Sequence, residues 1–207
     1  MKQLLLFTIW LSIAGQSFGQ SFKRKLNESA FDFVERTMSS DQATVTGKVL
    51  ETKWNSQTVI IAFLSTEEIV VQSENQHSIT NLEGYVLFQT SDDEYKKVYI
   101  DSYEEEGAVA EIASVFFSNA DEDEEKELIV LCSWDQNMHA APISGFFYQT
   151  NFYDQQNIEH LNDQLIKLDL DKHFPFEFDG TNDEGTRSKA TYTNATKIKQ
   201  RLTELGY

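Results

Sequence analysis

The feature that most constrains this chain is a change of period at about Thr44, after which polar and apolar residues alternate. Short runs rich in Val, Ile, Phe and Tyr then follow one another as far as Tyr153, with turn residues or charges between them. Such runs are typical of β-strands. The predicted strands span residues 45–49, 58–64, 69–72, 85–89, 98–103, 108–117, 127–133 and 145–153.

No helical pattern separates these runs, so consecutive strands are expected to pair with each other. This order favours an antiparallel sheet over parallel βαβ units. Two segments that end in glycine, 81–84 and 104–107, are predicted as hairpin turns. The predicted fold class is therefore α+β, with an antiparallel β-sheet of six to eight strands between residues 44 and 154.

Two helices are predicted after this sheet, packed on one face or end of it. The first spans about 157–168, and the second is capped by Thr193 or Asn194 and ends at Gly206. Each has apolar residues at helical spacing. These residues are Ile158, Leu161, Leu165 and Leu168 in the first helix, and Ile198, Leu202 and Leu205 in the second.

The first 19 residues have the pattern of a secretory signal peptide. Lys2 precedes an apolar run of 11 residues, and Ser17-Phe18-Gly19 fits a small-x-small cleavage site before Gln20. The run is too short to span a bilayer, which takes about 20 residues. We therefore expect an exported protein, periplasmic or extracellular. Its mature part has a polar segment with a short helix at 20–43, where Asn27 or Ser29 is the predicted cap, and a single domain at 44–207.

The amino-acid composition limits the classes of molecule that this protein can bind. The chain has 34 acidic and 17 basic residues, for a formal net charge of -17. A nucleic-acid partner is excluded, because phosphate contacts need clustered Lys and Arg. Beyond residue 19 no segment reaches 18 apolar residues, so no membrane span is expected in the mature chain. The partner is expected to be a protein or a small molecule of unknown identity.

The single cysteine, Cys132, lies in the apolar run 128–132. A lone cysteine cannot form an internal disulfide, and one within an apolar run is expected to be buried and inert.

The most chemically specific segment is the acidic stretch 119–127. Oxygen-bearing side chains occupy its first, third, fifth and ninth positions, and the seventh can offer a backbone carbonyl. Hard cations such as Ca²⁺ are bound by six to eight such oxygens. The predicted ligands are Asn119, Asp121, Asp123, Glu125 and Glu127. An EF-hand is not indicated, because its twelfth position needs a Glu and Val130 stands there.

This segment resembles the calcium loop of FG-GAP (integrin-propeller-like) repeats, which reads D-x-D-x-D-G-x-x-D-L between two strands. Residues 114–117 lead in and 128–131 lead out, and Phe152-Tyr153-Asp154 resembles the end of such a unit. The resemblance covers about 108–154, one unit rather than a propeller, and implies a Ca²⁺ cofactor. Glu124 stands where the family has Gly, so a left-handed backbone there is expected to cost about 1 kcal/mol.

The acidic loop has two possible interpretations. It is either a calcium site or a metal-free, solvated hairpin tip. The C-terminal residues 193–207 resemble the closing helix of small exported proteins from Bacteroidetes-type bacteria, a likeness that carries no activity.

The function favoured by these patterns is an exported, non-catalytic binding or interaction protein, with Ca²⁺ in the 119–127 loop as its one candidate cofactor. No catalytic residue is predicted. One alternative is a small exported hydrolase that uses the 134–139 loop, with Asp135 and His139 as an acid–base pair. Another is an inhibitor whose acidic surface meets a basic partner.

Overall fold

The computed structural model describes residues 20–72, 75–137, 143–155 and 160–207. Eleven strands and two helices lie within these ranges, and neither helix has the length and apolar composition to cross a membrane. The elements are β1 (Ser21–Lys23), α1 (Ala30–Met38), β2 (Ala43–Trp54), β3 (Gln57–Gln72), β4 (Asn75–Gln89), β5 (Glu94–Tyr103), β6 (Glu111–Ser118), β7 (Glu127–Asp135), β8 (Ser144–Asp154), β9 (Ile166–Leu168), β10 (Glu177–Thr181), β11 (Arg187–Ser188) and α2 (Ala195–Leu205).

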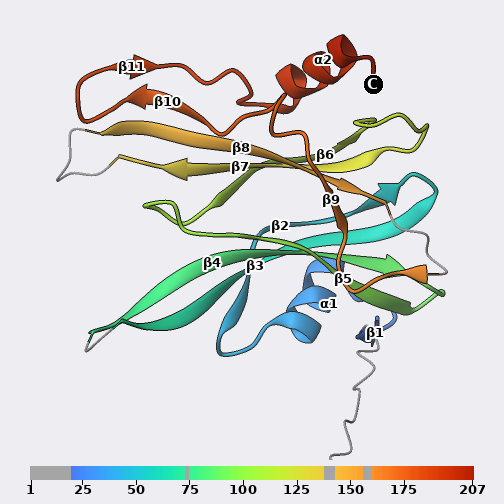
Figure 1. The fold of residues 1–207 in the computed structure, drawn as a ribbon. Helices are drawn as coiled ribbons and strands as arrows, with labels where there is room; N and C mark the ends of the chain where they lie inside the picture. Colours follow the sequence, from blue (N-terminus) through green and yellow to red (C-terminus); the bar gives the residue numbers. More distant parts are fainter. Residues whose placement is uncertain (1–19, 73–74, 138–142, 156–159) are drawn as a thin grey trace, which may run out of the picture.

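The strands form two sheets stacked face to face (Figure 1). The lower sheet has the order β1-β5-β4-β3-β2, and the upper sheet has the order β11-β10-β8-β7-β6, with β9 also paired to β8. All pairs between these strands are antiparallel, which confirms the predicted pairing. Within the described chain, seven strands, β2 to β8, lie in the range where six to eight were predicted, four more lie outside it, and the eleven are divided between two sheets instead of one.

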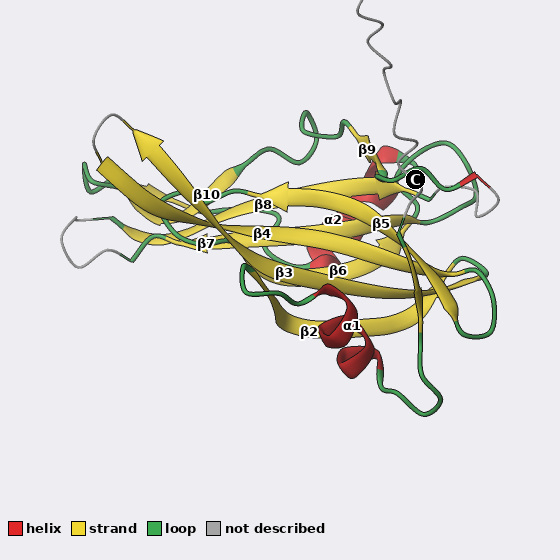
Figure 2. Ribbon diagram, turned by 90° about the horizontal axis from the view of Figure 1, so that it is seen from below, coloured by secondary structure: helices red, strands yellow, loops and turns green. Residues whose placement is uncertain are grey.

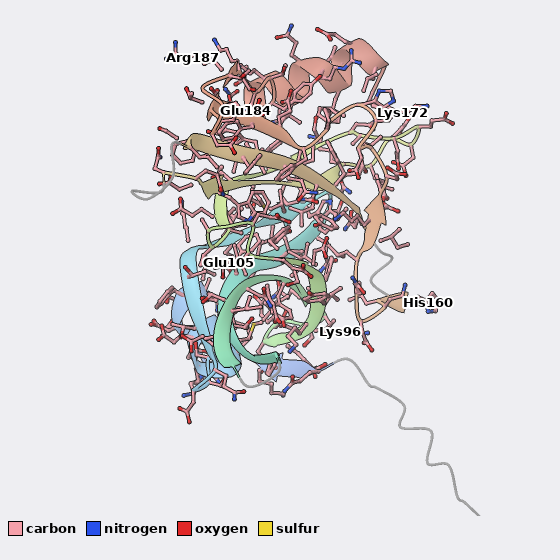
Figure 3. The ribbon with its side chains drawn as sticks, turned by 60° about the vertical axis from the view of Figure 1, so that its left-hand side comes forward. Lys96, Glu105, His160, Lys172, Glu184 and Arg187 are labelled. Carbon is pink, nitrogen blue, oxygen red and sulfur yellow. The ribbon has the colours of Figure 1, made fainter. Side chains whose placement is uncertain are left out.

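The strands are divided between two sheets because the segment after β5 crosses from the lower sheet to the upper sheet. Glu105 marks this crossing in Figure 3. Residues 104–107 were predicted as a hairpin turn, but β5 and β6 belong to different sheets and do not pair. Gly107 has a φ of 76°, so its glycine serves a sharp change of direction between layers.

The second predicted turn, 81–84, is also wrong, because these residues lie inside β4. The β3–β4 pairing continues from Val59–Phe88 to Gln72–Asn75 without a break at this point. A Cβ on Gly84 would lie 3.1 Å from a ring carbon of Phe63. This glycine therefore reflects close packing in the core, which the sequence pattern does not distinguish from a turn.

The main core lies between the two sheets, and each sheet carries a helix on its outer face. Phe33 and Val34 of α1 pack on the lower sheet, and Ile198 and Leu202 of α2 pack on the upper sheet. Figure 2, viewed from below, shows α1 on the outer face of the lower sheet. Of the two helices expected together on one face or end of the sheet, only the C-terminal one, α2, forms within the described chain; the other helix is α1, from the N-terminal segment, and it covers the outer apolar face of the other sheet. Burial of one large apolar side chain contributes about 1.5–3 kcal/mol.

The caps of both helices agree with the sequence. The Ser29 side chain accepts a hydrogen bond from the Asp32 amide at 3.1 Å, and Asn194 accepts one from the Lys197 amide at the same distance. Gly206 has a φ of 98° at the end of α2. These local signals act within one turn of a helix, so the sequence is sufficient to predict them.

The helix predicted at 157–168 is wrong over its described part. Residues 166–168 form β9, and Leu165 donates its amide to the Tyr99 carbonyl at 2.8 Å. Leu161 and Leu165 are buried in the core between the sheets. The apolar spacing that predicted a helix belongs instead to an extended segment. This segment joins β5 of the lower sheet to β8 of the upper sheet. Residues 156–159 lie outside the described ranges.

Candidate metal centre

The acidic loop connects β6 to β7, whose last backbone pair is Ser118–Glu127. Three successive side-chain-to-backbone hydrogen bonds fold it. The Asp121 amide donates to Asn119 Oδ1 (3.1 Å), the Asp123 amide to Asp121 Oδ1 (2.9 Å), and the Glu125 amide to Asp123 Oδ1 (2.7 Å). The side chains at alternate positions thereby hold the loop backbone through amides two residues ahead.

Three of the predicted ligands come together. One carboxylate oxygen each from Asp121, Asp123 and Glu127 lie within 4.8 Å of one another. Since a Ca–O bond is about 2.3–2.6 Å long, two oxygens on opposite sides of one ion are about 5 Å apart. Three oxygens this close together can all contact one cation.

Glu127 is the exceptional member of the cluster, because it is fully buried. One oxygen, Oε2, accepts a hydrogen bond from the Ala120 amide, while Oε1 has no hydrogen-bond donor among the described residues. Burial, together with the neighbouring charges of Asp121 and Asp123, raises the pKa of Glu127 to about 7. A buried carboxylate oxygen without a partner is costly, and a cation is one group that removes this cost.

Asp154 is a fourth acid beside the loop, at the end of β8. Its pKa is raised by partial burial and then by the charges of Asp121, Asp123 and Glu125. The sequence places it at the end of the FG-GAP-like unit without naming it as a ligand. The register explains its position: Tyr153 pairs with Leu128, so Asp154 follows opposite the start of β7.

The two remaining predicted ligands have other contacts. The Asn119 side chain folds the loop through its Oδ1 and through its Nδ2, which donates to the Asp123 carbonyl at 2.6 Å. Glu125, which was predicted to offer its backbone carbonyl, is exposed and donates its amide to Asp123 Oδ1 at 2.7 Å. Their role as ligands stays a prediction.

Glu124 does not have the left-handed backbone that the resemblance implies. Among the described residues other than glycine, only Asn27 and Asn55 have a positive φ. The expected strain at Glu124 is therefore absent. The reason is local: the bonds from the Asx side chains close the loop with ordinary negative φ values.

The base of the loop is tied to the lower sheet. Trp54, at the end of β2, donates its indole N–H to the Lys126 carbonyl, and the Lys126 amide donates to Asn55 Oδ1 at 3.0 Å. Asn55 has a φ of 50° in the two-residue turn between β2 and β3. No sequence pattern indicated this contact, because its partners are more than 70 positions apart.

A second polar cluster, buried at its two tyrosines and exposed at its lysine, joins the sheets farther along. The hydroxyls of Tyr103 and Tyr153 lie 3.2 Å apart, Tyr153 donates to Asp101 Oδ2 at 2.9 Å, and Lys167 forms an ion pair with Asp101 at 2.8 Å. Burial raises the pKa of both tyrosines. With every member paired, this cluster acts as a cross-link between layers.

Of the other sequence candidates, one is buried, one closes a turn, and one lies outside the described residues. Cys132 is fully buried, as predicted, and burial raises the pKa of its thiol. Asp135 accepts hydrogen bonds from the backbone and side chain of Asn137 at 2.8 and 2.6 Å, which closes a turn. His139, its expected partner in acid–base chemistry, lies outside the described residues.

Comparisons of this chain with known protein families, curated proteins and solved structures found no match. The FG-GAP resemblance thus rests on the loop residues themselves.

Proposed function

We propose that the chain is an exported, non-catalytic binding protein whose β6–β7 loop holds one Ca²⁺. The observation that carries the proposal is the buried Glu127 oxygen without a donor beside Asp121 and Asp123. A hard cation can bind several oxygens at once through its positive charge. No hydrogen-bond donor among the described residues reaches Glu127 Oε1.

The proposed role of the ion is to stabilise the end of the sandwich. Glu127 begins β7 and Asp154 ends β8, while the base of the loop is bonded to the β2–β3 turn. An ion bound by the loop would neutralise carboxylates that now repel one another. Its binding should therefore favour the folded state by mass action, by about 2.7 kcal/mol at 100 times the dissociation constant.

Calorimetric titration of the EDTA-treated protein with CaCl₂ tests this proposal. We expect one saturable site, with a rise in melting temperature on addition of calcium. Asp121→Asn should weaken binding at least tenfold, because it removes a charged ligand but keeps an oxygen to accept the Asp123 amide. Glu122→Gln is the matched control, since Glu122 is an exposed acid of the same loop outside the cluster.

A response to MgCl₂ or NaCl equal to that for CaCl₂ would identify the loop as a charged hairpin tip. So would the absence of saturable heat up to millimolar calcium. The proposed export is tested separately: N-terminal sequencing of secreted protein should begin at or close to Gln20, and recovery of intact Met1 from a soluble cytoplasmic protein would refute it.

A further inference from the structure

A cavity of about 580 Å³ opens between β2 and β6, which are the edge strands of the lower and upper sheets. The opposite side of the sandwich is closed, because the segment that contains Leu161 and Leu165 joins β5 to β8 there. On the β2–β6 side no such segment covers the gap within the described chain. A volume of this size is typical of sites that hold one small molecule.

Both edge strands are bulged where they line this cavity. In β2, Gly47, Lys48 and Val49 stand between two backbone pairs that enclose a single residue of β3. In β6, Ala113 is an extra residue between the Ile112 and Ser114 pairs. Bulges bend a strand and are common beside binding sites. The two bulges occur on different sheets yet line the same opening.

The floor of the cavity is apolar, and its walls combine aliphatic side chains with small ones. Ile61, Phe63 and Leu82 of the lower sheet are buried in the core beneath it. Ala110 and Ala113 line the β6 side with single methyl groups. A Cβ on Gly47, whose φ is 66°, would meet no atom within 4 Å. The short side chains thus leave room between larger ones of the same walls, such as Leu50 and Ile112.

The mouth carries one cation and one anion. Among the described residues, Lys48 and Glu111 are the only charged ones that line the cavity, and both are exposed. Within the described residues the Lys48 ammonium has no ion-pair partner, although the chain has twice as many acidic as basic side chains. A free ammonium at the edge of an apolar cavity suits a ligand with an apolar body and an anionic head.

We infer that this cleft binds one amphipathic anion of the aliphatic carboxylate class, with its chain over Ile61 and Phe63 and its carboxylate at Lys48. An added peptide strand fits less well, because the bulges interrupt the row of backbone groups that strand pairing needs. The inference names the ligand class for the binding role proposed above and rests on that role, but it does not depend on calcium.

Calorimetric titration with dodecanoate below its micelle concentration tests this assignment, in EDTA, because free calcium would precipitate the carboxylate. We expect one site per chain and a dissociation constant in the micromolar range. Lys48→Glu should weaken binding at least fivefold, whereas Lys53→Glu, an exposed lysine of β2 outside the cavity, should leave it unchanged. Dodecanol, which lacks the charge, should bind more weakly to the native protein and equally to both variants.

A second variant tests the space itself. Ala113→Trp places an indole at the mouth and should abolish binding, while Thr196→Trp on the exposed surface of α2 should not. Non-saturable dodecanoate binding, or native affinity in both Lys48→Glu and Ala113→Trp, would overturn the assignment. So would capture of an extended peptide, or dimerisation blocked by Ala113→Trp, in place of dodecanoate binding. Failure of the calcium titration alone would remove the metal proposal and leave this one standing.

Discussion

The Trp54 indole N–H donates to the Lys126 carbonyl and so links the end of β2 in one sheet to the base of the acidic loop in the other. The same ring stacks between Phe88 and Phe117, at centroid distances of 5.9 and 5.5 Å. One buried side chain thus packs the core and positions the candidate metal loop. Mutation can separate the two roles. Phenylalanine in place of Trp54 still packs in the core, but it has no N–H to donate to the Lys126 carbonyl.

Trp54→Phe should lower the free energy of unfolding by about 0.5–1.5 kcal/mol, since the Lys126 carbonyl loses its indole donor. It should also weaken calcium binding severalfold by loosening the base of the loop. Urea denaturation and calcium calorimetry measure the two effects. Trp134→Phe is the matched control: it loses an equivalent bond to the Glu104 carbonyl, 2.9 Å long and away from the loop, and should change stability alone. Equal effects of both variants on calcium affinity would contradict this assignment.

Glu127 should give the metal-free protein a characteristic pH dependence. Its pKa is about 7 in the folded state against an ordinary value of 4.5, so the folded state holds a proton that the unfolded state releases between these values. The stability from this group is therefore complete below about pH 4.5 and decreases as the pH rises toward 7, by at most about 3 kcal/mol. Asp154, whose pKa is also raised, acts in the same direction.

Denaturation in EDTA between pH 5 and 8 measures this slope. Glu127→Gln should flatten it and give a more stable protein than the native one at pH 8. Glu124→Gln, which removes an exposed acid of the same loop, should keep the native slope. In the presence of calcium the native protein should instead lose affinity on acidification below pH 7, because protons compete for the Glu127 carboxylate.

Glu124→Gly should give no gain in calcium affinity. The FG-GAP pattern implies a relief of strain, but Glu124 already has an ordinary backbone, and glycine adds flexibility worth about 0.5–1 kcal/mol to the unfolded state. Affinity should stay within about threefold of native and the melting temperature should fall slightly. A tenfold increase in affinity, measured by the same calorimetry, would show that the loaded loop adopts the left-handed geometry.

Cys132 should resist thiol reagents in the native protein. The residue is fully buried in β7, and burial raises the pKa of its thiol, so the reactive thiolate is scarce and inaccessible. Labelling with an aromatic disulfide should require unfolding and follow its rate as urea increases. Rapid stoichiometric labelling in buffer at pH 8 would place Cys132 on an accessible path.

Local patterns in the sequence were sufficient for several elements. Ser29 and Asn194 cap their helices through bonds to amides three residues away, and Gly206 ends the last helix. The Asx spacing of Asp121 and Asp123 likewise folds the acidic loop through neighbours two positions apart. In each case the interacting groups are close in the chain, so their spacing alone specifies the geometry.

The sequence therefore determined the antiparallel strands, the terminal helix, the buried cysteine and the acidic residues that converge. Only the tertiary structure decided that the strands form two sheets, that Leu161 and Leu165 belong to an extended segment closing one side, and that Glu127 is buried with an unpartnered oxygen. It also decided that two bulged edges face each other across a cavity. The physical reason is that burial and layer assignment depend on contacts between residues far apart in the chain, which apolar spacing does not encode.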